Sequence, residues 1–166
     1  MTLTEYLTWF DEVVGPTERM MRMVPPDRLD WKLTDKSFTL GQLLAHISRS
    51  LWFNAQVFKG GELPAKNIRE ILVGNRRQVS ATVEEAVSQL ASNSALFKET
   101  VAGLGEERFQ RELIDSPQRG RVPAWRLAAF TLEHHIHHLM ELHLCLKVLG
   151  IKVHTGTLYS ASESPS

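Results

Sequence analysis

The sequence contains a single cysteine, no excess charge of either sign and no long apolar run. Because Cys145 is alone, a disulfide within the chain is excluded, and the folded state must depend on a packed core. Lys plus Arg number 19 and Asp plus Glu number 19, so charge gives no reason to expect nucleic acid or an anionic membrane as a partner. No apolar stretch approaches the roughly 18 residues that a membrane span needs.

The N-terminus and the lone thiol indicate the compartment. The chain opens with MTLTEYLTWFDEVV, which lacks the charged-then-apolar pattern of a signal peptide. A single thiol suits a reducing environment, so we expect a cytoplasmic protein. The length of 166 residues fits one domain, which we place at 1–159. The remaining tail, 160–166, reads SASESPS and has the composition of a disordered segment.

Start and stop signals of helices recur along the chain, and no β-type alternation competes with them. The capping-box pattern, Thr followed three residues later by Glu or Gln, occurs at Thr2–Glu5, Thr39–Gln42 and Thr82–Glu85. Pro123 fits the first turn of a fourth helix, and the stops fall at Pro25-Pro26, Gly60-Gly61, Gly103 and Gly150. These signals predict helices at roughly 3–24, 40–59, 83–102 and 123–149. Four long helices predict an all-α fold, a four-helix bundle.

The segments between these helices are less regular. Gly15-Pro16 lies inside the first helix and predicts a kink or break there. We expect 25–38 and 103–122 to be connections, while 67–77 forms either a short extra helix or an early start of the third. The last helix also carries an apolar outer face, made of Leu132, Ile136, Leu139 and Met140. Either the 62–81 segment covers this face or a second subunit does, and we favour a homodimer.

Five of the seven histidines lie between residues 134 and 143. At about 100° per residue, His134 and His138 share a helix face with an inward stripe of Leu127, Thr131, Glu141, Cys145 and Leu149. His46 has the same placement on the second helix, with Leu43, Ser50, Phe53 and Val57. The pattern therefore predicts three histidines pointing into one bundle. We expect His135 and His137 to lie beside the site or at the surface, His143 at the surface, and Cys145 in the core.

Three convergent imidazoles are a metal-binding set. Neutral imidazole ligates zinc, nickel, copper or ferrous iron, and two histidines four residues apart on a helix can hold one ion. A third histidine from a neighbouring helix leaves open positions for water or substrate, as in catalytic metal centres. The simpler alternative is that these histidines are core residues that form hydrogen bonds and bind no metal.

Trp31, Trp52 and Trp125 are either pocket or packing residues, and Arg119-Gly120-Arg121 is either an anion site or a solvated turn.

The chain also resembles the DinB/YfiT-like superfamily of four-helix-bundle metalloproteins. The likeness rests on three stretches: RMVPPDRLDWKLTDKSFTLGQLLAHI at 22–47, LEHHIHHLMELHLCLKVLG at 132–150 and IKVHTGTLY at 151–159. The resemblance implies that His46, His134 and His138 are the metal ligands, the same triad that the helix faces predict. The family commonly has Arg-Gly-Gln after its last ligand, whereas this chain has Leu139-Met140-Glu141. Glu141 is then either an acceptor that orients a histidine or a general base for a catalytic water, with a plain polar position as the alternative.

The resemblance implies a metal site more firmly than a reaction. Characterised relatives resemble thiol S-transferases or isomerases that use bacillithiol or mycothiol, and others are metal-dependent hydrolases. We therefore expect a divalent metal (zinc, nickel or iron), a small-molecule substrate and a low-molecular-weight thiol as a possible second cofactor. The alternative is a non-catalytic metal-binding or stress-response protein in which the ion is structural.

Overall fold

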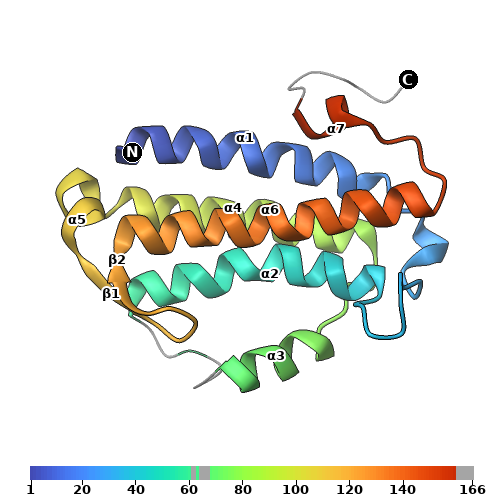
Figure 1. The fold of residues 1–166 in the computed structure, drawn as a ribbon, viewed down its shortest axis with the longest axis horizontal. Helices are drawn as coiled ribbons and strands as arrows, with labels where there is room; N and C mark the ends of the chain where they lie inside the picture. Colours follow the sequence, from blue (N-terminus) through green and yellow to red (C-terminus); the bar gives the residue numbers. More distant parts are fainter. Residues whose placement is uncertain (61–62, 64–67, 160–166) are drawn as a thin grey trace.

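The computed structural model describes residues 1–60, 63 and 68–159 of the chain. Four long helices make up its body: α1 (Leu3–Arg22), α2 (Leu40–Lys59), α4 (Val83–Ala102) and α6 (Ala124–Val148). Each contacts two of the others, in the order α1, α4, α2, α6 and back to α1 (Figure 1). This closed arrangement confirms the predicted all-α bundle. The predicted tail, 160–166, lies outside the described residues.

Smaller elements complete the fold. They are a 3-10 turn (Pro26–Arg28), α3 (Ile68–Arg77), α5 (Gly105–Arg111), the strands β1 (Leu113–Ser116) and β2 (Gly120–Pro123), and α7 (Thr155–Tyr159). The helix α3 packs against α2, and α7 packs against α1 (Figure 1). The described part of the 67–77 segment is therefore a separate short helix, which was one of the two expectations.

None of the helices among the described residues is long and apolar enough to cross a membrane. The cytoplasmic location stays a prediction.

The helix ends follow the local capping chemistry closely. Thr2 and Thr39 form complete capping boxes with Glu5 and Gln42. The hydroxyl of Thr82 accepts the backbone N–H of the glutamate three residues on, but that carboxylate accepts from Ala81 instead of closing the box. The second helix ends at Gly60, whose φ of 65° is left-handed and therefore suits glycine.

The expectation that 103–122 is only a connection was wrong. The segment 103–122 holds α5 and an antiparallel hairpin, in which Leu113 pairs with Pro123 and Ser116 with Gly120. Pro123 is thus the last residue of a strand and the N-cap of α6, not a residue of its first turn. The helix α1 runs through Pro16 as one helix, so of the kink or break considered at Gly15-Pro16 the break does not occur.

The expectation that Leu132, Ile136, Leu139 and Met140 form an exposed apolar face of α6 was partly wrong as well. Leu132 is fully buried and Leu139 is 6% exposed, because α6 lies between α1 and α2 and buries a wide sector of its surface. What remains exposed is a stripe at four-residue spacing, Met140, Leu144 and Val148. We call it the α6 stripe. The homodimer stays a prediction, and this narrower stripe is now its basis.

Candidate metal centre

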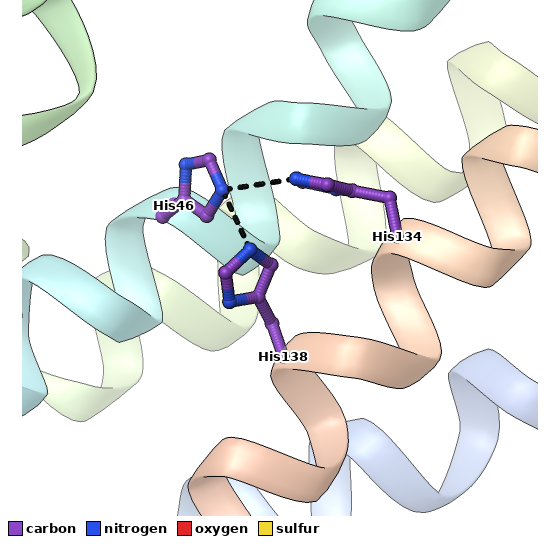
Figure 2. A group of neighbouring side chains, drawn as sticks. All are labelled: His46, His134 and His138. Atoms are coloured by element: carbon purple, nitrogen blue, oxygen red, sulfur yellow. Dashed lines mark hydrogen bonds between the residues drawn. The ribbon is translucent and has the colours of Figure 1, made fainter. Parts of the chain in front are cut away.

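Three imidazole nitrogens meet between α2 and α6. His46 comes from the first half of α2, and His134 and His138 come from successive turns of α6 (Figure 2). The Nε2 atom of His46 lies 3.3 Å from Nε2 of His134 and 3.0 Å from Nε2 of His138. The structure therefore brings together all three histidines predicted from the sequence as a group positioned to hold a metal ion.

The spacing of these nitrogens fits a metal ion. Two nitrogens bound to one tetrahedral ion at about 2.0–2.1 Å stand about 3.3 Å apart, close to both observed separations. The three ring planes stand at 74–85° to one another, and a nitrogen of His134 and one of His138 point toward the same nitrogen of His46 (Figure 2). The donor set and its geometry thus match a three-histidine centre.

The surroundings keep the imidazoles of His46 and His134 neutral, which metal binding requires. Burial, followed by the neighbouring His138 and His134, lowers the pKa of His46 to about 3. The Asn75 side chain on α3 opposes this by a hydrogen bond that favours the charged form. Burial, then His138 and His137, lower the pKa of His134 to about 4. At neutral pH both groups therefore present lone pairs instead of positive charge.

Glu141 contacts the outer side of the centre. Its Oε2 lies 2.8 Å from Nδ1 of His138, one turn away on α6. The hydrogen bond from His138 lowers the pKa of Glu141, while partial burial opposes the shift. An ionised carboxylate on Nδ1 holds the proton there and leaves Nε2 as the metal-facing atom. This contact matches the orienting role considered for Glu141, and its role as a general base stays a prediction.

A cavity of about 750 Å³ opens beside the histidines. Its wall is built by α2, α3, α4, α6 and the turn between the two strands. Phe38 stands 5.3 Å from the His46 ring and Phe130 stands 6.2 Å from the His134 ring, so aromatic side chains flank the centre. Trp52 and Arg119 line this cavity, and the guanidinium of Arg119 lies 4.3 Å from the centre of the Phe130 ring. Since ligand pockets are typically apolar with a few polar groups, this cavity suits a small molecule.

Of the other histidines of α6, two are buried in the bundle, and His137 is exposed, as one of its two expectations had it. His135 is 1% exposed, and its Nε2 lies 2.9 Å from the Thr17 hydroxyl on α1. Because that hydroxyl donates to the Val13 carbonyl, the histidine is the donor to Thr17. His143, expected at the surface, is 6% exposed. His137 is exposed and forms a second possible metal group with His138 and Glu141.

Cys145 stays apart from the centre. It is 5% exposed, and burial, with a smaller effect from Glu141, raises the pKa of its thiol to about 11. A thiol with so high a pKa is neutral at physiological pH and is a poor ligand and nucleophile. The expectation of a core cysteine is confirmed by its burial.

Known proteins place this architecture in one family. The DinB superfamily matches residues 10–142, and the chain belongs to that superfamily. A DinB-like protein from Bacillus cereus ATCC 10987 aligns with a TM-score of 0.74 at 14% identity, over 92% of this chain and 96% of that one. The DinB-like protein YjoA from Bacillus subtilis aligns with a TM-score of 0.70 at 20% identity, over 94% and 99%. No curated protein sequence matches this chain.

Proposed function

We propose that this DinB-superfamily protein is a metal-dependent enzyme that acts on a small molecule in the cavity beside His46, His134 and His138. The observation that carries the proposal is the meeting of three Nε2 atoms at the wall of that cavity. A site used only for structure is normally closed by protein ligands, whereas three protein ligands next to a cavity leave room for a reactant.

The residues of the chain have distinct tasks in this proposal. A divalent ion held by the three histidines would supply Lewis acidity, which lowers the pKa of a water or small thiol bound to it. His46 and His134 supply neutral ligand nitrogens because burial holds their pKa values low. Glu141 fixes the tautomer of His138 through the 2.8 Å contact at Nδ1. The reaction that we propose is thiol transfer to, or hydrolysis of, a small electrophilic compound.

Elemental analysis of protein purified without an affinity tag tests the metal. We expect about one divalent ion per chain in the wild type and loss of that ion in His46→Ala, His134→Ala and His138→Ala. His137→Ala is the matched control, since it removes an exposed imidazole from the same helix. Retention of metal in all three triad variants would contradict the proposal. Loss in His137→Ala with retention in His46→Ala would move the site to the second group, His137, His138 and Glu141.

A structural ion is the second candidate function, favoured by the fact that the ligands join two different helices, α2 and α6. The two functions differ in whether the coordination positions that the three histidines leave free can bind a small molecule. An enzyme of the proposed type binds a small thiol or hydroxamate at the ion, whereas a purely structural ion binds neither. Cobalt-substituted protein reports this directly, because a new ligand changes the visible absorption of the cobalt.

A further inference from the structure

One arginine of the hairpin lies against an aromatic ring that borders the histidines. The guanidinium of Arg119, in the turn between β1 and β2, lies 4.3 Å from the centre of the Phe130 ring. The Phe130 ring centre is 6.2 Å from that of His134, and all three side chains line the cavity. The Arg119 side chain is 43% exposed, so a ligand in the cavity can reach it. A cation–π contact of this kind restrains a guanidinium and leaves N–H donors available.

The positive charge of Arg119 is only weakly paired. Its ion-pair partner is Glu133, whose Oε2 lies 3.6 Å from Nη2, too far for a good hydrogen bond. Glu133 already accepts two hydrogen bonds from Arg126, at 2.9 Å and 3.2 Å. Two cations thus share one carboxylate, and Arg126 makes the closer, bidentate contact. Arg119 therefore keeps surplus charge and has no side-chain hydrogen bond to another described residue.

The rest of the cavity wall does not offset this charge. Among the described residues that line it, Arg49 and Arg119 are two cations and Glu70 is one acid. A cavity with such a balance attracts anions. A guanidinium matches a carboxylate in particular, because its planar fork forms two parallel N–H···O bonds with the two carboxylate oxygens. A single negative charge also suits a wall with an excess of one cation.

From these contacts we propose that Arg119 is a specificity residue that binds a carboxylate of the substrate, with its guanidinium restrained by Phe130. The substrate is then a small organic acid, with its reactive group at the three histidines and its carboxylate at the hairpin. This inference rests on the proposed function, because it takes the histidines as the reacting end. Of the two alternatives for Arg119-Gly120-Arg121, it assigns Arg119 to an anion site. Arg121 is exposed and does not line the cavity.

Hydroxamic acids that differ only at their far end provide the test. One set is the monohydroxamic acids of succinic, adipic and suberic acid, which keep a free carboxylate. In the other set a neutral carboxamide of similar shape replaces that carboxylate. Three chain lengths are compared because the best length depends on the path of the ligand through the cavity. With zinc-loaded wild type, calorimetry is expected to show about tenfold tighter binding of the acid at one or more lengths, the gain of about one charge-assisted contact.

Substitutions then assign this preference to Arg119. Arg119→Gln removes the charge and the fork and is expected to abolish the preference for the acid, whereas Arg119→Lys keeps the charge alone and should retain part of it. Arg121→Gln is the matched control, because it removes the same charge from the same hairpin at a position outside the cavity wall. We expect all three variants to bind zinc like the wild type, since none of them changes a histidine.

Two results overturn the role of Arg119 while the metal centre stands. One is equal affinity of acid and amide in the wild type at every chain length. The other is a preference that Arg119→Gln leaves unchanged or that Arg121→Gln reduces equally.

The carboxylate contact is also tested separately from the metal. If no hydroxamate of either set binds, the proposed function fails, and Arg119 is examined in metal-free protein by NMR. There millimolar hexanoate is expected to shift the Nε–Hε signal of Arg119, assigned through Arg119→Lys, and hexanamide is not. An unshifted signal with hexanoate, or equal shifts with both compounds, overturns the inference.

Discussion

Glu141 provides the sharpest test of how this centre is built. Its carboxylate holds Nδ1 of His138 at 2.8 Å, and its side chain is 27% exposed, so the group can be replaced without opening the core. Glu141→Leu removes the acceptor and frees the His138 ring to rotate and to change tautomer. Loss of such an outer contact typically weakens metal binding about 10–100-fold, which corresponds to about 1.4–2.7 kcal/mol. Glu141→Gln keeps an acceptor oxygen but loses the charge, and we expect a smaller loss.

The assay is a competition titration of zinc against a chromophoric chelator at pH 7.5. Glu133→Gln is the control, because Glu133 is a glutamate of the same helix that pairs with Arg126 at the surface. We expect Glu133→Gln to bind zinc like the wild type. The reasoning is refuted if Glu141→Leu binds zinc with wild-type affinity while His138→Ala does not bind it. In that case the contact between Glu141 and Nδ1 of His138 contributes nothing to zinc affinity, and proton transfer is the role of Glu141 that is left to test.

Four further outcomes follow from the structure. Thr17→Val leaves a fully buried histidine of α6 without its hydroxyl partner, and urea unfolding is expected to show a loss of about 1–3 kcal/mol. In metal-free protein the pKa values of His46 and His134 lie below their unfolded value of 6.5, so the unfolded state binds more protons and the urea midpoint should fall as pH drops from about 6.5 toward 4. An unchanged midpoint between pH 7 and pH 5 would contradict this. Cys145 should resist thiol reagents at pH 8 in the folded state and react fully in urea, so rapid labelling of native protein would disprove its burial. If the α6 stripe forms a homodimer, light scattering should show a dimer at micromolar concentration and a monomer for Leu144→Glu, and a wild-type monomer would refute it.

Most of the fold could be predicted because its signals are local. Three of the four long helices start at the residues predicted, since an N-cap threonine contacts the backbone only three positions away. The hairpin was missed because β1 and β2 are short strands that pair across a turn, and so short a strand carries too little alternation to recognise. Pro123, the last residue of β2, was interpreted only as the start of the following helix, so the strand before it was not predicted.

The burial of His135 had a signal that the single-face analysis of α6 overlooked. His135 starts a second apolar row at helical spacing, continued by Leu139, Leu142 and Leu146, all buried. A helix with two such rows packs between two neighbours. In this bundle the second row contributes to the contact with α1, where Thr17 meets the histidine.

The sequence by itself determined where three of the four long helices begin and which three histidines point into the bundle, because capping and helical period act within a few residues. It also placed Glu141 within reach of His138, one turn away on the same helix. Only the tertiary structure decided the cavity beside the histidines and the Asn75 contact from α3. These features join helices far apart in the chain, and no local pattern encodes the distance between them. The three histidines that could hold a metal ion were therefore predictable from the sequence, whereas the cavity beside them forms only once α2, α3, α4 and α6 have packed.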